Sequence, residues 1–136
     1  MSTGYSGTPL TKKLGIKPSM KYALYGEPDY YFELFEEWPI DTSQLPNPEN
    51  EELDFIHVFC KGIEDLEKAY AHFKPLLSKN GMMWISWPKK SSGIKTDIDG
   101  NKVRSHILHN GLVDVKIASV DKTWSALKAV YRKKDR

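Results

Sequence analysis

The stretch LDFIHVFC, residues 53–60, is apolar at every position except Asp54 and His57. A continuous apolar run of this length is typical of a strand that is covered on both faces, as in a parallel sheet. Apolar side chains at intervals of three and four residues then predict a helix over 64–77. A second apolar run, MMWISW at 82–87, predicts another buried strand. The order strand, helix, strand is that of a right-handed crossover unit in a parallel sheet.

Toward the N-terminus, the residues before this unit predict one strand and two helices. A flexible opening around Gly4–Gly7 leads, within the N-terminal segment 1–20, to a short helix that Thr8 and Pro9 begin and Gly15 ends. A short strand over 21–25 follows. Pro28 is well placed to begin an amphipathic helix, whose core-facing side chains are Tyr30, Tyr31, Leu34, Phe35 and Trp38.

Prolines and turn residues divide the rest of the chain. Pro39, Pro46 and Pro48 predict a loop over 39–52, with at most a short edge strand near Ile40. Asn80-Gly81 predicts a turn before the second buried strand. A helix is expected over 100–110, after a polar loop at 88–99.

The C-terminal end predicts a hairpin. Residues 113–120 and 125–131 both alternate between apolar and polar side chains, and only 121–124 separate them. A connection this short requires antiparallel pairing. Residues 132–136 are expected to be a solvated basic tail.

These elements predict one α/β domain over residues 1–136. Its sheet is Rossmann-like, mostly parallel and five-stranded, with helices on both faces and a C-terminal antiparallel hairpin strand. The composition, 40% hydrophobic and 28% charged, is that of a globular domain. One cysteine, the absence of a 20-residue apolar span and the polar start predict a cytoplasmic protein without a membrane partner. A net charge of +2 provides no global field for nucleic acid, so nucleic acid is not the expected partner.

Two stretches resemble the class I methyltransferase fold. LLSKNGMMWI, residues 76–85, is similar to that family's approach to a central strand, and LDFIHVF, residues 53–59, is similar to the strand two elements earlier. The resemblance implies the spatial strand order 21–25, 53–60, 82–87, 125–131, 113–120, with only 125–131 antiparallel to the others.

A second resemblance covers nearly the whole chain. A family of short bacterial proteins, catalogued as a domain of unknown function, is similar in five stretches: GYSGTPL (4–10), KLGI (13–16), SWPKK (86–90), LVDVK (112–116) and WSALK (124–128). This resemblance implies no activity.

The methyltransferase resemblance makes S-adenosylmethionine the cofactor to consider. Such enzymes hold it with a Gly-rich turn after the first strand and an acid that ends the second. Here that turn is Tyr25-Gly26-Glu27-Pro28-Asp29, with one glycine, two carboxylates and a proline that lacks the N–H donor. Asp41 is the one reasonable candidate for the acid. We therefore expect no bound S-adenosylmethionine, and no other cofactor is indicated.

Ligands of open α/β sheets bind beyond the carboxyl ends of the strands. Two tryptophans there would form an apolar wall or pack against the sheet, and two lysines would contact an anion or lie in solvent. The candidate ligand-binding residues at that edge are Gly26, Glu27, Trp87, Lys89, Lys90, Asp121 and Trp124. The aromatic and basic residues of this set are predicted to share one surface; they are Trp87, Lys89, Lys90 and Trp124.

No residue pattern points to catalysis or to a metal. His57 lies inside a buried strand, where a histidine bonded to a core partner is expected. Cys60 ends that strand, but no histidine is assigned to activate its thiol. His106 and His109 have a spacing that binds metals, without the further ligands that a site needs.

The sequence therefore favours a non-catalytic domain that binds an anionic small molecule or a protein partner at the carboxyl edge of the sheet. Two alternatives stay open. One is a small-molecule methyltransferase with a degenerate cofactor loop. The other is a structural or regulatory interaction protein that uses exposed aromatic side chains of the 30–38 helix.

Overall fold

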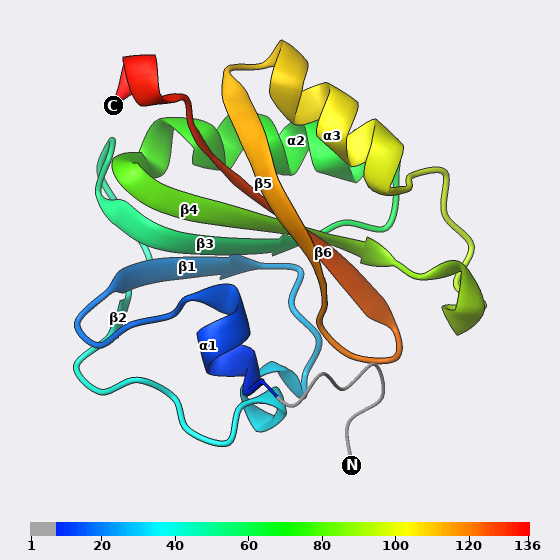
Figure 1. Cartoon of the computed structure of the whole chain (residues 1–136), viewed down its shortest axis with the longest axis horizontal. Helices are drawn as coiled ribbons and strands as arrows, with labels where there is room; N and C mark the ends of the chain where they lie inside the picture. The colour runs from blue at the N-terminus through cyan, green and yellow to red at the C-terminus, as the bar shows by residue number, and fades with distance from the viewer. Residues whose placement is uncertain (1–7) are drawn as a thin grey trace.

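The computed structural model describes residues 8–136 and shows one mixed sheet of six strands in the order β2-β1-β3-β4-β6-β5 (Figure 1). The Gly4–Gly7 stretch that the sequence predicts to be flexible lies outside the described residues. The strands are β1 (Lys21–Tyr25), β2 (Ser43–Gln44), β3 (Leu53–Phe59), β4 (Leu77–Pro88), β5 (Leu112–Ser119) and β6 (Trp124–Tyr131). The helices are α1 (Leu10–Leu14), α2 (Ile63–Phe73) and α3 (Gly100–His109).

The order and directions of the five expected strands are confirmed. β1, β3 and β4 pair in parallel, β6 lies antiparallel against β4, and β5 pairs antiparallel with β6 at the outer edge. The sixth strand, β2, is two residues long and pairs in parallel with the free side of β1. It is the short edge strand that the proline-rich 39–52 segment leaves room for, placed at Ser43–Gln44 rather than at Ile40.

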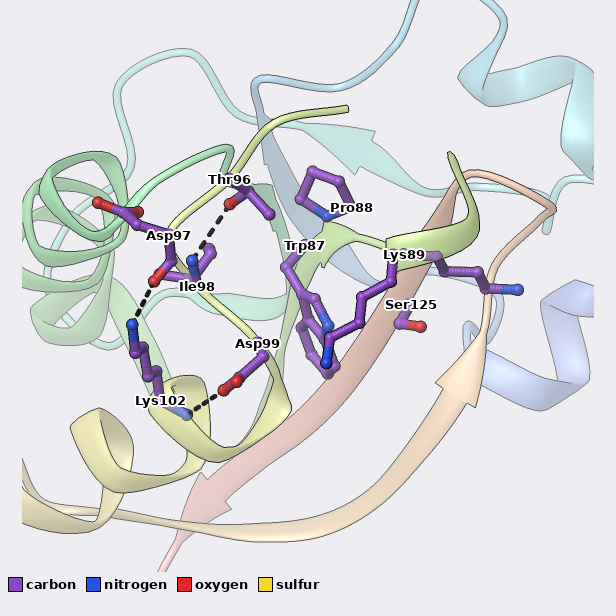
Figure 2. Close-up of a pocket in the computed structure, with 10 residues that line it drawn as sticks. Trp87, Pro88, Lys89, Thr96, Asp97, Ile98, Asp99, Lys102 and Ser125 are labelled. Carbon is purple, nitrogen blue, oxygen red and sulfur yellow. Dashed lines mark hydrogen bonds between the residues drawn. The ribbon is translucent and has the colours of Figure 1, made fainter. Parts of the chain in front are cut away.

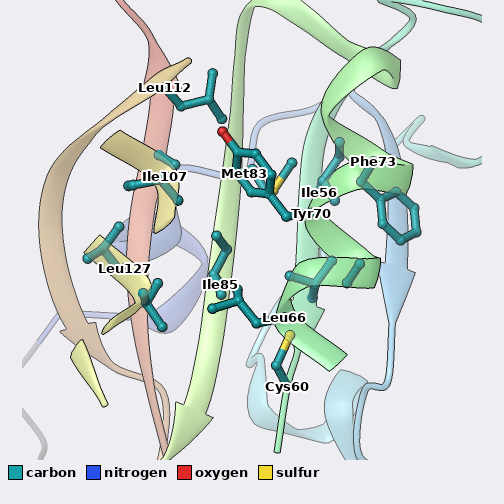
Figure 3. Packing of buried hydrophobic residues seen from close by; sticks show 14 of the residues in the cluster. Ile56, Cys60, Leu66, Tyr70, Phe73, Met83, Ile85, Ile107, Leu112 and Leu127 are labelled. Atoms are coloured by element: carbon teal, nitrogen blue, oxygen red, sulfur yellow. The ribbon is translucent and has the colours of Figure 1, made fainter. Parts of the chain in front are cut away.

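Helices cover both faces of the sheet, as expected. One face carries α2 and α3, and Figure 3 shows Tyr70 and Phe73 of α2 and Ile107 of α3 packed with Met83 and Ile85 of β4. The other face carries α1 and the aromatic segment after β1, which pack with β4 and the hairpin. Pro9 rather than Thr8 occupies the N-cap of α1, without a capping side chain. No helix among residues 8–136 has the length and apolarity that a membrane span requires.

The expected turn at Asn80-Gly81 is wrong, because β4 runs without interruption from Leu77 to Pro88. The helix before it ends at Phe73, and Pro75 lies in a single 3-10 turn that leads into the strand. The register against β3 shifts at this point, because Leu53 pairs with Leu77 and Phe55 with Met82, so β4 is irregular where the turn was expected. A Cβ on Gly81 would lie 2.9 Å from the carbonyl oxygen of Leu53, so the glycine serves the close approach of β3 rather than a turn.

The amphipathic helix expected after Pro28 is also wrong. Only Tyr31–Leu34 are helical, as one 3-10 turn, and Phe35 is already extended. The aromatic spacing instead buries Tyr31 and Phe35 against the sheet, whereas Phe32 stays 46% exposed. Of the aromatic side chains on which the interaction-protein alternative depends, Tyr31 and Phe35 are therefore interior, whereas Tyr30 and Phe32 stay exposed.

Candidate functional site

A pocket of about 370 Å³ opens where β4 leaves the sheet at its carboxyl edge (Figure 2). The end of β4 forms one side, and the loop leading into α3 forms the other. The residues that line it are Trp87, Pro88, Lys89, Lys90, Thr96, Asp97, Ile98, Asp99, Lys102 and Ser125. Three of the residues expected at this edge, Trp87, Lys89 and Lys90, therefore meet in one pocket.

Two aspartates hold the far wall in place. Asp97 Oδ1 accepts a hydrogen bond from the backbone N–H of Ile63 at 2.7 Å, which ties the loop to the start of α2. Asp99 is the N-cap of α3, and its Oδ1 accepts from the backbone N–H of Lys102 at 2.9 Å. Lys102 Nζ donates in turn to the carbonyl oxygen of Asp97 at 2.7 Å, as Figure 2 shows. The wall is thus built by ordinary helix capping and loop bonding.

Two lysines, Lys89 and Lys90, lie on the β4 side of the pocket and differ in their contacts. Lys89 Nζ donates to Ser119 Oγ of the neighbouring hairpin at 2.6 Å, and its backbone N–H bonds to Thr123. Lys90 is exposed, and its ammonium makes neither a hydrogen bond nor an ion pair within residues 8–136. Of the two lysines, Lys90 therefore carries the charge that is free to meet a ligand.

Trp87 forms the floor of the pocket. Its ring lies against Gly100 at the start of α3, where an added Cβ would come within 3.1 Å of the indole, and the side chain is 7% exposed. The indole Nε1 has no hydrogen-bond partner among the described residues. Every buried polar side-chain atom of these residues does have a partner, so the Nε1 atom is not buried. The N–H is therefore accessible from the pocket and available as a donor.

Trp124 does not join this surface, which corrects the expected wall of two tryptophans. It pairs across the strands with Pro88, whereas Trp87 pairs with Ser125. Neighbouring positions on a strand face opposite sides, so the two indoles lie on opposite faces of the sheet. Trp124 packs edge-on against Phe59 with ring centroids 5.0 Å apart and is 4% exposed.

Asp121 holds the hairpin tip together. Its Oδ1 accepts from the backbone N–H groups of Thr123 and Trp124, both at 2.8 Å, and its Oδ2 accepts from Tyr30 Oη at 2.9 Å. These bonds make an Asx turn, and the carboxylate is occupied by the fold itself.

Gly26 and Glu27 lie outside the pocket lining, at the end of β1. Gly26 has φ +66°, and an added Cβ would stand 2.6 Å from the carbonyl oxygen of Phe59. The glycine therefore allows the turn to pack on β3, which accounts for it without a ligand. Burial first, then the charges of Tyr22 and Glu27, raise the pKa of Tyr31.

This turn does not fit S-adenosylmethionine in the way the fold family holds it. Its only glycine is packed against β3, Pro28 supplies no N–H, and Glu27 and Asp29 repel a carboxylate. Asp41 cannot supply the ribose contact, because it precedes β2 and lies at the amino end of that strand. No acid occurs at the carboxyl end of β2, where Leu45 and Pro46 follow.

His57 lies at the centre of a buried polar chain, as the sequence predicts for a core histidine. Its Nδ1 is 2.9 Å from Tyr31 Oη, and its Nε2 is 2.8 Å from Ser86 Oγ. All three side chains are almost completely buried. Burial lowers the pKa of His57 to about 3, so the ring is neutral near pH 7 and joins three elements rather than exchanging protons with solvent.

Cys60 is fully buried at the end of β3. Burial, with a smaller contribution from Asp65, raises the pKa of its thiol to about 12. A thiol in this state is a poor nucleophile. The His106 ring packs edge-on against Tyr70, and His109 bonds to the carbonyl oxygen of Ser105. No group of three potential metal ligands occurs within residues 8–136.

The far wall of the pocket, formed by the loop that leads into α3, was not predicted from the sequence. Residues 88–99 read only as a polar loop, although Asp99 before Gly100 is a helix N-cap signal. That signal places the loop end at the start of α3. The closeness of this helix to Trp87 depends on packing across the sheet, which no local pattern shows.

Comparison with known proteins shows the fold and no family. No family model matches the chain, and no curated protein matches it. Solved structures do match. One is a Sulfolobus solfataricus protein assigned to the type 11 methyltransferases, with a TM-score of 0.63 and 14% identity over 91% of this chain and 90% of that one.

Two further structures are similar. A SAM-dependent methyltransferase from Aquifex aeolicus has a TM-score of 0.52 and 15% identity over 88% of this chain and 86% of its own. The B. subtilis tRNA methyltransferase TrmK has a TM-score of 0.55 and 12% identity over 99% of this chain and 68% of its own. The chain therefore has a methyltransferase-like fold. Its resemblance to a bacterial domain of unknown function stays a prediction.

Proposed function

We propose that this domain binds a small molecule with an anionic group in the pocket between the end of β4 and the start of α3. The observation that carries the proposal is that one pocket holds two groups without a partner within residues 8–136, the exposed ammonium of Lys90 and the accessible indole N–H of Trp87. The Lys90 ammonium supplies a positive charge, and the Trp87 indole supplies a hydrogen-bond donor of fixed direction. Pockets at this edge are the usual ligand sites of open α/β sheets.

The charges of the pocket support an anion of modest size. Three lysines and two aspartates line it, but each aspartate already accepts a backbone N–H with one oxygen. Lys89 and Lys102 donate hydrogen bonds within the fold, so among residues 8–136 Lys90 is the pocket lysine whose ammonium has no such partner. A volume near 370 Å³ suits a small ligand. A single partly exposed charge contact contributes about 1 kcal/mol, so we expect a dissociation constant in the micromolar to millimolar range.

Calorimetry with inorganic phosphate, pyrophosphate, citrate and AMP tests the proposal. At least one of these probes should bind, and Lys90→Ala should weaken it about fivefold, equivalent to about 1 kcal/mol. Lys95→Ala is the matched control, because Lys95 is exposed in the same loop but outside the pocket lining. Unaltered binding in Lys90→Ala, or equal loss in both variants, would refute the site.

The alternative function is S-adenosylmethionine-dependent methyl transfer, and the observation that favours it is the fold. The expected cofactor residues argue against it, because Gly26 is packed against β3, Pro28 has no N–H to donate, and Asp41 lies at the wrong end of β2. S-adenosylmethionine belongs in the same calorimetric series. Binding with a thermal shift of several degrees at millimolar concentration would favour the methyltransferase, since a ligand of the native state must stabilise it.

A further inference from the structure

Two lysines face each other across the C-terminal hairpin. Lys116 of β5 and Lys128 of β6 are direct partners in the antiparallel register. Side chains at such positions have Cβ atoms about 5 Å apart and share one face of the sheet. A like-charge pair in this arrangement is destabilising, so the fold alone gives no reason for it.

A third lysine lies close to this pair. Burial first, then the charges of Lys116 and Lys17, lower the pKa of Lys128. No carboxylate is among the groups that act on Lys128, and no ion pair within residues 8–136 involves any of the three lysines. Lys17 also borders a groove that Glu36 and Glu37 line, so the hairpin pair is the centre of the cluster and Lys17 its margin.

The cluster lies on the opposite face of the sheet from the pocket described above. Lys128 lies on the same face of β6 as Trp124 and Ala126, which pack on the α1 side, whereas Trp87 and Leu127 pack on the side of α2 and α3. The nearby acid Asp114 faces that other side, where it pairs with Arg104 at 3.0 Å. The three lysines therefore share a surface that this acid does not neutralise.

We propose that Lys17, Lys116 and Lys128 form a phosphate-binding surface, independent of the pocket at the carboxyl edge. Lysine ammonium groups are compact charges that suit the tetrahedral phosphate rather than planar, bidentate recognition. The net charge of +2 gives no sign of this basic surface, because the many acidic residues of 27–54 offset its lysines in the total charge of the chain.

Two probes separate the sources of such a phosphate. Pyrophosphate represents a small free anion, and a fluorescent 20-nucleotide single strand represents a phosphodiester backbone. The first is followed by calorimetry and the second by anisotropy at 50 to 200 mM salt. Binding of either probe at this surface supports the proposal, and the probe that binds identifies the source.

The test variant is Lys116→Ala/Lys128→Ala, and its control is Lys68→Ala/Lys95→Ala, which removes two exposed lysines elsewhere and changes the net charge equally. The test variant should lose about tenfold in affinity, and for the oligonucleotide its salt slope should fall by about 1.4, since each lysine–phosphate contact contributes about 0.7. Its melting temperature should not fall, because the like-charge pair is removed. Both probes are also measured in the Lys90→Ala background, which weakens the pocket at the carboxyl edge. The loss caused by Lys116→Ala/Lys128→Ala should be the same there, which separates this surface from the pocket.

Three results would overturn the proposal. They are no binding of either probe at 50 mM salt, unaltered binding in the test variant, or equal loss in test and control variants. In the last case the binding would reflect total charge rather than this surface.

Discussion

The buried His57 makes the stability of the domain sensitive to acid. Its imidazole is 0% exposed, and burial lowers its pKa from the usual 6.5 to about 3. Both ring nitrogens are occupied, by Tyr31 Oη at 2.9 Å and Ser86 Oγ at 2.8 Å. In the unfolded chain the same ring is solvated and takes a proton near pH 6.5.

The direction of the effect follows from these two pKa values. Between pH 6.5 and about 3 the unfolded chain binds a proton at His57 that the folded chain does not. Acid therefore favours unfolding, and the contribution of a neutral His57 is complete above pH 6.5 and is lost as the pH falls. Each pH unit in this window removes about 1.4 kcal/mol. Lowering the pH from 7 to 4.5 should remove about 2.5 to 3 kcal/mol through this residue alone.

Urea denaturation at pH 7.0, 6.0, 5.0 and 4.5 measures this contribution, with His57→Gln as the comparison. Glutamine keeps a polar group in the core but does not titrate, so the difference between the two pH curves cancels every group common to both proteins. Below pH 6.5 the free energy of unfolding of the wild type should fall by about 1.4 kcal/mol more per pH unit than that of His57→Gln. Parallel curves would refute the neutral, buried histidine, whatever the absolute stability of the variant at pH 7.

Three further predictions concern single residues. Gly26→Ala should destabilise the domain by about 2 kcal/mol or more in urea denaturation, because its φ of +66° is strained for alanine and the added Cβ meets the Phe59 carbonyl at 2.6 Å; a change below 0.5 kcal/mol would contradict the packing of this turn. Asp121→Ala should cost about 1 to 2 kcal/mol by freeing two backbone N–H groups and the Tyr30 hydroxyl at the hairpin tip, and wild-type stability would show that these bonds are unimportant. Cys60 should resist iodoacetamide at pH 8 in the native protein and react in urea, since burial raises the pKa of its thiol to about 12; rapid native labelling would contradict its burial.

The central strands and the C-terminal hairpin could be predicted because their signals are local and strong. The apolar runs of β3 and β4 are long enough to be strands covered on both faces, and the four-residue connection before Trp124 leaves only a hairpin. The resemblance to the methyltransferase fold supplied the spatial order, which periodicity alone does not give. His57 could be placed in the core for the same reason, since it lies within a buried run.

The segment after Pro28 shows where local signals end. Its aromatic spacing is helical, but Tyr31 contacts His57 and Phe59 of β3, and Phe35 and Trp38 pack around it. These contacts stabilise a segment that packs against the sheet rather than one that continues as a helix, so tertiary packing overrides the periodicity.

The two tryptophans of the expected site show a second limit. Both were correctly placed near the carboxyl edge, and Lys89 does reach the hairpin through Ser119. The face on which each indole lies, however, depends on the strand register, and shifting the register by one residue reverses it. Trp87 pairs with Ser125 and Trp124 with Pro88, a register that the sequence did not specify.

The most direct test of the carboxyl-edge site is an NMR titration that follows the indole N–H of Trp87. A Trp87→Phe variant assigns this resonance among the four tryptophans of the chain. With a probe that calorimetry shows to bind, the indole signal should shift in a saturable manner, together with the backbone amides of Lys90 and Asp97–Gly100. A saturable shift confined to other regions, with the Trp87 indole unmoved, would contradict the account.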